Sequence, residues 1–229
     1  NMNNYIEIKN LSKSYYNEKK INVLKNLNFK FKKGKIYSLV GPSGSGKSTL
    51  LNILCLIDRP SNGNLIINNV KINFEKINKN DKIRCNNFGI IYQEKNLLND
   101  FTAEENISIA GIAKGKSLEE SADFTKKILK KLKLFKRSKH FPSQLSGGEN
   151  QRIAIARALV NSPNFIIADE PSGNLDNKNA KDFFKLLFNL KSRNRIIIYA
   201  THNRYFANKA DCKLEMVDGN IKTINARIK

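Results

Sequence analysis

The stretch Gly41-Pro42-Ser43-Gly44-Ser45-Gly46-Lys47-Ser48 decides how the rest of this sequence is interpreted. It fits the pattern G-x-x-x-x-G-K-[ST] at every fixed position, and it lies between an apolar run at residues 36–40 and a helical pattern at residues 48–57. Glycines let such a loop turn tightly and point its N–H groups inward, and the start of the helix adds a partial positive charge. The sequence therefore predicts a phosphate-binding loop between a buried strand and a helix.

The side chains of this loop suit a nucleoside triphosphate with its metal ion. Lys47 can reach the β- and γ-phosphates, and the hydroxyl of Ser48 can ligate Mg²⁺. From this loop we expect the ATP-binding residues Gly41, Pro42, Ser43, Gly44, Ser45, Gly46, Lys47, Ser48 and Thr49.

A pair of carboxylates follows another apolar run, at residues 165–168. Asp169 ends that run, where an aspartate holds Mg²⁺ in enzymes with this loop, and Glu170 lies one residue further, where it can face a water molecule. Two roles need two carboxylates, because one fixes the metal while the other orients or deprotonates the water. We therefore predict Asp169 as a metal ligand and Glu170 as the catalytic base.

Apolar strands alternate with helices along most of the chain. Strands are predicted at residues 36–40, 89–92, 165–168 and 196–200, and helices at residues 48–57, 103–133, 149–160 and 181–190. Shorter β-like runs lie at residues 5–8, 27–31, 65–67 and 70–72, with a hairpin-like turn at Asn68-Asn69, and a second hairpin is predicted at residues 214–224. This order indicates an α/β fold with a parallel sheet buried on both faces, whose ligands bind beyond the carboxyl ends of the strands.

The composition is strongly basic, with a net charge of +21 from 41 Lys and Arg against 20 Asp and Glu. A nucleic-acid or anionic-lipid partner is one interpretation. The other is a compositional bias, which we favour because 32 of the basic residues are Lys and they are spread along the chain together with many Asn and Ile. No apolar run approaches the roughly 18 residues of a membrane span. Three scattered cysteines, Cys55, Cys85 and Cys212, indicate a reducing, cytoplasmic compartment.

Leu145-Ser146-Gly147-Gly148-Glu149-Asn150-Gln151-Arg152 opens a predicted helix about a hundred residues after the phosphate loop. This octet resembles the signature of the ABC ATPases, and the resemblance extends over essentially the whole chain. It implies one P-loop NTPase domain of the ABC type at residues 2–229, with a mostly parallel core sheet. It also implies an antiparallel β subdomain at about residues 2–33 and 62–75, and an α-helical subdomain at about residues 94–148.

The resemblance also implies how the nucleotide is held. Ser146, Gly147 and Gly148 would bind, in trans, the ATP held by a second copy in an ATP-dependent, head-to-tail homodimer. Gln93 resembles the glutamine that contacts Mg²⁺ and the attacking water, and His202 resembles the histidine that contacts the γ-phosphate, so both join Glu170 as catalytic candidates. Tyr15 resembles the aromatic that stacks on adenine, with Tyr16 as a competitor. Residues 172–176 resemble the loop that lies across the dimer axis.

The same resemblance implies a partner. A single nucleotide-binding unit with about fifty residues between Gln93 and Leu145 is similar to the motor subunits that drive a separate transmembrane permease from the cytoplasmic face of the membrane. Residues 41–54, 58–63, 96–98 and 168–176 look most like a branch with ATPases for lipoprotein release, macrolide export and peptide export, and the cell-division ATPase. A force-transmitting ATPase stays open as an alternative, as does, with less support, one stimulated by nucleic acid. We expect no specific nucleic-acid partner. Glu149, Ser172 and Asn203 depart from the residues most common in the family, but no group assigned to the chemistry is lost.

Overall fold

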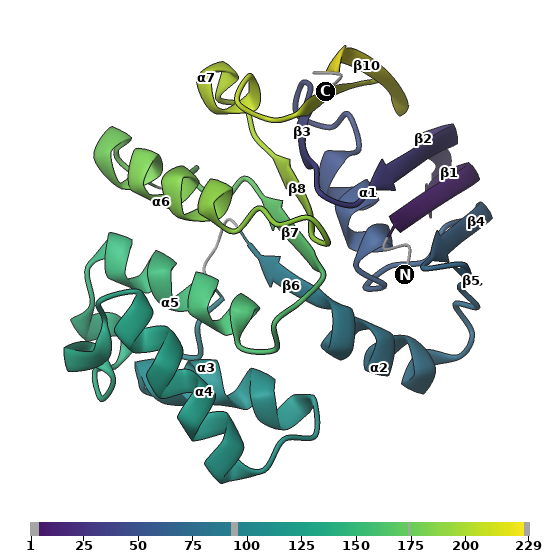
Figure 1. Ribbon diagram of the computed structural model, residues 1–229. Helices are drawn as coiled ribbons and strands as arrows, with labels where there is room; N and C mark the ends of the chain where they lie inside the picture. The colour runs from purple at the N-terminus through teal and green to yellow at the C-terminus, as the bar shows by residue number, and fades with distance from the viewer. Residues whose placement is uncertain (1–4, 93–95, 174, 227–229) are drawn as a thin grey trace.

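The computed structural model describes residues 5–92, 96–173 and 175–226, in which helices flank two β-sheets (Figure 1). The strands are β1 (Tyr5–Asn17), β2 (Lys19–Lys32), β3 (Ile36–Val40), β4 (Asn62–Ile67), β5 (Val70–Lys71), β6 (Phe88–Ile91), β7 (Phe165–Asp169), β8 (Ile196–Ala200), β9 (Cys212–Val217) and β10 (Asn220–Ala226). The helices are α1 (Lys47–Leu54), α2 (Ile77–Asn87), α3 (Ala103–Ala113), α4 (Leu118–Lys131), α5 (Gly147–Leu159), α6 (Asn177–Asn189) and α7 (Arg204–Ala207), with short 3-10 turns η1 (Phe135–Arg137) and η2 (Pro142–Gln144).

The central sheet has six strands in the order β10-β9-β3-β8-β7-β6. Neighbouring strands from β9 to β6 run parallel, and only β10 is antiparallel to its neighbour. Alternate side chains of β7 are buried in two different hydrophobic cores, one on each face of the sheet. Phe165 and Ile167 pack with α1 on one face. Ile166 and Ala168 pack with α5 and α6 on the other face. A strand covered on both faces is apolar throughout, which is why these strands were recognisable in the sequence.

The second sheet is antiparallel, in the order β2-β1-β4-β5. Its buried side chains, among them Ile6, Ile8 and Leu65, join α1 in the first of the two cores. The predicted turn at Asn68-Asn69 joins β4 to β5, and both asparagines have positive φ angles of 52° and 68°, as a tight hairpin requires. The predicted combination of a mostly parallel sheet, an antiparallel sheet and a group of helices is therefore confirmed.

Several predicted boundaries were wrong. The single helical segment predicted at residues 103–133 is two helices, because Gly115 takes a positive φ of 96° and Ser117 caps a new helix. Helix α1 ends at Leu54, short of the predicted residue 57, and β1 and β2 are much longer than predicted. Helix α2 was not predicted because its sequence has no apolar stripe; Asn80 is its one buried residue.

Each helix from α3 to α6 begins with a polar side chain that accepts a hydrogen bond from the first turn: Thr102, Ser117, Ser146 and Asp176 respectively. In α3, α4 and α5 a glutamate at the third helical position returns a bond to the backbone of the cap, which completes a capping box. A cap of this kind stabilises a helix by about 1 kcal/mol. Helix α1 differs, because its N-cap residue is Gly46, which has no side chain to accept such a bond.

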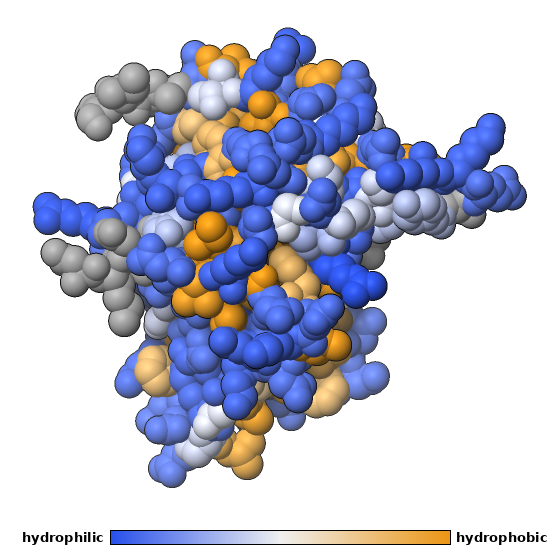
Figure 2. Space-filling model, turned by 90° about the vertical axis from the view of Figure 1, so that its right-hand side faces the viewer, coloured by the Kyte–Doolittle hydropathy of each residue, from blue (hydrophilic) through white to orange (hydrophobic). Residues whose placement is uncertain are grey.

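The surface is predominantly hydrophilic. Figure 2 shows the face that carries the antiparallel sheet, where hydrophobic side chains form small patches between projecting hydrophilic ones. Within the described residues no helix combines the length and apolar character needed to cross a bilayer. Cys55, Cys85 and Cys212 are all free thiols.

Candidate active site

Three parallel strands of the central sheet end side by side, and the phosphate loop, Glu170 and His202 follow them. Leu39 of β3 and Asp169 of β7 both pair with Ala200 of β8. Beyond the strands, the N–H of Thr201 donates to the carbonyl of Leu39 over 3.1 Å, and the N–H of Glu170 donates to the carbonyl of Ala200 over 3.2 Å. The loops that carry the phosphate-binding motif, Glu170 and His202 therefore meet at one edge of the sheet.

The phosphate loop is held tightly against the strands around it. Lys47 is buried, and its ammonium group donates to the carbonyls of Gly41 and Pro42 over 3.0 and 2.9 Å. A methyl group added at Gly41 would lie 2.1 Å from the carbonyl oxygen of Met216, so only glycine fits there. Since α1 has no side-chain cap, no side chain competes for the N–H groups of its first turn, which suits an anion.

Glu170 and His202 contact each other directly. The Nε2 atom of His202 lies 3.0 Å from Oε1 of Glu170, and the N–H of His202 donates to Oε2 of Glu170 over 3.2 Å. The carboxylate is mostly buried, with 15% of its side chain exposed, whereas 57% of the His202 side chain is exposed. The backbone at Glu170 has a positive φ of 42°, which is uncommon for a non-glycine residue and is typical of functional sites.

Three buried polar atoms of the site have no hydrogen-bond partner among the described residues: Oδ1 of Asp169, Oγ of Ser45, and Oε1 of Glu170, which has only its ion-pair contact with His202. Buried polar atoms are nearly always paired, so each such atom needs an explanation. A carboxylate at a strand end and a hydroxyl in a phosphate loop are groups that Mg²⁺ and phosphate oxygens satisfy. The residues present therefore fit a nucleotide and its metal ion.

A cavity of about 590 Å³ opens beside these residues and is lined by Gly41, Pro42, Thr201 and His202, together with side chains of α7, β9 and β10. Asn203, three residues after β8, is the N-cap of helix α7. Its side-chain Oδ1 accepts from the N–H groups of Tyr205 and Phe206 over 3.0 and 3.3 Å. The departure of this position from the aspartate common in the family therefore retains a helix cap directly after His202.

Tyr15 is tied to the region of the phosphate loop, and Tyr16 is not. The hydroxyl of Tyr15 donates to Asp58 over 2.7 Å, the ammonium group of Lys13 lies 4.7 Å from the centre of its ring, and Thr49 of α1 is a hydrogen-bonding neighbour. Burial and the nearby Asp58 raise the pKa of Tyr15, so its hydroxyl stays protonated. Tyr16 is 78% exposed. The ring of Tyr15 is thus the one placed beside the nucleotide loop.

Asp58 links Lys13 and Tyr15, a role that no motif in the sequence indicated. Its carboxylate accepts from the ammonium of Lys13 over 2.7 Å as well as from Tyr15. Burial alone would raise its pKa, but the bonds from Lys13, Tyr15 and the Arg59 N–H lower the pKa overall. Asp58 is 45 residues from Lys13, and only the folded chain brings the two together.

The signature residues begin α5, on the opposite face of the sheet from α1. Oγ of Ser146 accepts from the N–H of Glu149 over 3.2 Å, and Oε2 of Glu149 accepts from the N–H of Ser146 over 2.9 Å. Gly148 faces α6 closely, since an added methyl group would lie 2.5 Å from Oδ1 of Asn179. The two helices that follow the glycine-rich motifs, α1 and α5, therefore lie on different faces of the sheet.

Residues that follow Glu170 connect the two regions. The buried side chain of Gln151 in α5 donates to the carbonyl of Pro171 over 2.9 Å. Gly173 and Leu175 make turn hydrogen bonds to Glu170 and Ser172 over 3.0 and 3.1 Å. The signature helix is thus bonded directly to the loop that follows the predicted base.

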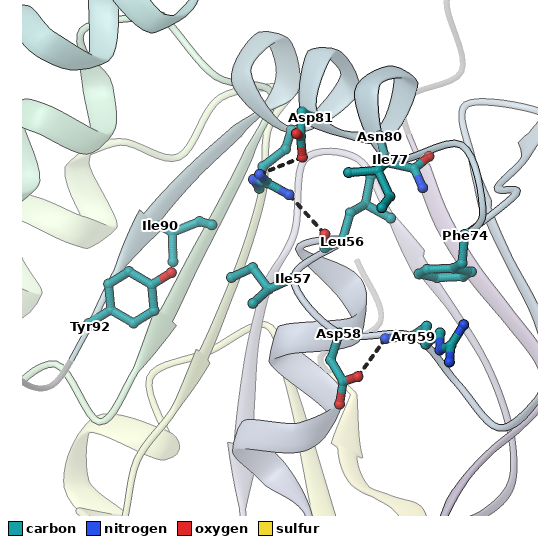
Figure 3. Close-up of a pocket in the computed structure, with 11 residues that line it drawn as sticks. Leu56, Ile57, Asp58, Arg59, Phe74, Ile77, Asn80, Asp81, Ile90 and Tyr92 are labelled. Atoms are coloured by element: carbon teal, nitrogen blue, oxygen red, sulfur yellow. Dashed lines mark hydrogen bonds and ion pairs between the residues drawn. The ribbon is translucent and has the colours of Figure 1, made fainter.

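Gln93 lies outside the described residues. Tyr92, the residue before it, lines a second cavity, of about 610 Å³. Ile90 lines the same side of this cavity, α2 lines another side, and residues 56–59 lie below it (Figure 3). Arg84 spans it, donating to Asp81 over 2.7 Å and to the carbonyl of Leu56 over 2.9 Å. Asp58 lines this cavity as well as holding Tyr15, so the cavity and the adenine-stacking candidate share a residue.

Comparisons with known proteins agree on one family. The family model described as ABC transporter matches residues 24–173. The lipoprotein-releasing system ATP-binding protein LolD of Buchnera aphidicola subsp. Schizaphis graminum is 43% identical over 96% of this chain and 98% of its own length. The LolD protein of Rickettsia felis is 44% identical over 92% of this chain and 94% of its own length.

Solved structures lead to the same family. A dimeric post-hydrolysis state of the ATP-binding cassette MJ0796, bound to ADP and Pi, superposes with a TM-score of 0.87, at 36% identity over 96% of this chain and 99% of that one. A second dimeric structure of MJ0796, a bacterial ABC transporter cassette, gives the same TM-score at 37% identity.

Proposed function

Because this chain belongs to the ABC transporter family and is an ATP-hydrolysing subunit that drives a separate permease, we propose that it powers a lipoprotein-releasing system at the inner face of a membrane. The relatives named above carry that activity in their names, at 43% and 44% identity over nearly their whole lengths. Force transmission without transport is the alternative, and the partner experiment below separates the two.

The observation that carries the catalytic part of this proposal is the meeting of Lys47, Asp169, Glu170 and His202 at one sheet edge. Lys47 and the N–H groups of the loop hold the phosphates, and Asp169 and the Ser48 hydroxyl hold Mg²⁺ together with Gln93. When bound, the metal ion neutralises charge that develops on the phosphate oxygens. Glu170 accepts the proton of the attacking water, and His202, held by the carboxylate of Glu170, contacts the γ-phosphate.

The second part of the proposal concerns the dimer. Ser146, Gly147 and Gly148 form an anion-binding helix start that lies across the sheet from the phosphate loop. We assign it to the nucleotide of a second copy, which produces a symmetric head-to-tail contact with two buried ATP molecules. The dimeric MJ0796 cassettes, which superpose on this chain, support that arrangement.

We further propose that residues 2–229 form one domain and that about residues 94–148 form its helical subdomain and receive the permease. The segment just before α3 is held by the buried Asn106, whose amide donates to the carbonyls of Leu98 and Phe101 over 3.0 and 2.9 Å. This leaves the side chains of Leu98 and Phe101 themselves 42% and 39% exposed. Exposed apolar side chains on a rigidly held segment suit contact with a partner.

Co-expression with its own membrane permease tests the proposed function. We expect the two to copurify in detergent and the permease to raise the ATPase rate, with release of a lipid-modified protein from vesicles. Leu98→Asp should abolish that stimulation without changing the basal rate. Leu118→Asp is the matched control, because Leu118 is 75% exposed and is the first residue of α4, away from the segment that precedes α3. Stimulation without release would favour the force-transmitting alternative, and stimulation by DNA or RNA would refute the proposal.

Removing the ring of Tyr15 should weaken ATP binding. Stacking of a base on an aromatic side chain contributes about 1–3 kcal/mol, so Tyr15→Ala should raise the dissociation constant roughly tenfold or more. Titration with a fluorescent ATP analogue measures this change. Tyr16→Ala removes an identical side chain one residue away and should leave the affinity unchanged. Equal losses in the two variants would contradict the assignment of Tyr15.

A further inference from the structure

Glu149 introduces a negative charge into a helix start that has to accept a phosphate. Its carboxylate is the reciprocal partner of Ser146 in the capping box, and 17% of its side chain is exposed. The bond from the Ser146 N–H, followed by the bonds from the Ser146 side chain and Arg137, lowers the pKa of Glu149 below its ordinary value despite partial burial. The carboxylate is therefore ionised at neutral pH, directly beside the cradle.

Arg137 pairs with that carboxylate from a separate element. Arg137 lies in η1, and its Nε atom donates to Oε1 of Glu149 over 2.9 Å. The other carboxylate oxygen, Oε2 of Glu149, accepts from the N–H of Ser146. Both oxygens of the carboxylate are thus engaged, one by the signature helix and one by the segment before it. A second nitrogen of Arg137, Nη1, lies 3.3 Å from Nε2 of His140.

Hydrogen bonds and an ion pair join the segment that contains Arg137 to the start of α3. The N–H of Ala103 donates to the carbonyl of His140 over 2.8 Å, and the N–H of Glu104 donates to the carbonyl of Ser138 over 3.0 Å. Lys139 pairs with the carboxylate of Glu104. A continuous set of bonds therefore runs from the start of α3, where we place the permease contact, through residues 137–140 to Glu149 and Ser146.

We propose that Arg137 is a positioning residue for the signature: through Glu149 it fixes Ser146 and balances the carboxylate charge, and it links the γ-phosphate cradle to the permease side of the molecule. This inference rests on the proposed function, since it assumes that Ser146 acts on the ATP of a second copy. A displacement at the start of α3 moves Arg137, and the loss of its bond leaves an uncompensated carboxylate facing a triphosphate.

The test measures ATP-dependent dimerisation in a Glu170→Gln background by light scattering at several protein concentrations. Adding Arg137→Ala should weaken the dimer on the order of tenfold, because a partly exposed pair is worth a few-fold and occurs twice in a symmetric dimer. Binding of a fluorescent ATP analogue to the monomer should not change, since the phosphate loop is untouched. Lys136→Ala is the matched control, because it removes one positive charge from the same turn without contacting Glu149.

Charge rescue separates positioning from mere stability of the fold. Adding Glu149→Gln to Arg137→Ala should restore the dimer, because a glutamine oxygen still accepts from the Ser146 N–H but carries no charge. A dimer unaffected by Arg137→Ala, or equally weak with and without Glu149→Gln, would overturn the inference while the proposed function stands. Failure of the Glu170→Gln parent to dimerise with ATP would instead refute the trans arrangement and the inference with it.

Discussion

Glu170→Gln is expected to reduce ATP hydrolysis by about 10²–10⁴-fold while ATP still binds, because general-base catalysis contributes a factor of this size. The amide keeps the shape of the carboxylate and can still accept a hydrogen bond from the N–H of His202, which is 3.2 Å from Oε2 in the present structure. It cannot accept a proton from water at neutral pH. ATP should therefore stay intact in a dimer that accumulates.

Three measurements on the purified variant check this expectation: phosphate release, binding of a fluorescent ATP analogue, and molar mass by light scattering with and without ATP. Glu119→Gln provides the control, because it makes the same chemical change at an exposed position of α4 and should leave all three unchanged. Normal turnover in Glu170→Gln would remove Glu170 from its role as base. Lost turnover without an ATP-dependent dimer would leave the base assignment standing and contradict the shared nucleotide site.

Lys47→Ala is expected to abolish measurable ATP binding and, with it, both hydrolysis and dimerisation. The ammonium group is buried within the loop, where it satisfies the carbonyls of Gly41 and Pro42 and is placed to meet the phosphates. A hydrogen bond to a charged group contributes about 1.5–3 kcal/mol, and several of them to a triphosphate make the loss at least about a hundredfold in affinity.

Calorimetric titration with ATP and Mg²⁺ measures the affinity of this variant. The thermal midpoint without nucleotide shows whether the loop has merely lost its shape. Lys47→Met is the companion variant, because it keeps the apolar stem that packs in the loop and removes only the charge. It should still unfold in one cooperative transition, at a temperature lowered by the loss of the two bonds to Gly41 and Pro42, and yet bind no ATP. Unaltered affinity in Lys47→Met would remove Lys47 from the phosphate site.

The sequence by itself determined the chemistry and the class of fold. The phosphate loop, the Asp169-Glu170 pair and the signature are short motifs whose backbone requirements are local, so their residue types identify them without a folded chain. Strands β3 and β8 were predicted with their observed bounds, because a strand buried on both faces is apolar along its whole length. The hairpin turns were recognisable because Asn, Asp and Gly accept a positive φ more readily than other residues.

Tertiary structure alone decided which distant groups meet. The bonds of Asp58 to Lys13 and Tyr15, and of Arg137 to Glu149, join elements that do not follow one another in the chain, and no local periodicity records such contacts. Helix α2 escaped prediction for a related reason, since it buries only Asn80 and therefore has no apolar stripe. The motifs could be identified from the sequence because their backbone geometry is local. The residues that position them could not, because their contacts depend on packing between segments far apart in sequence.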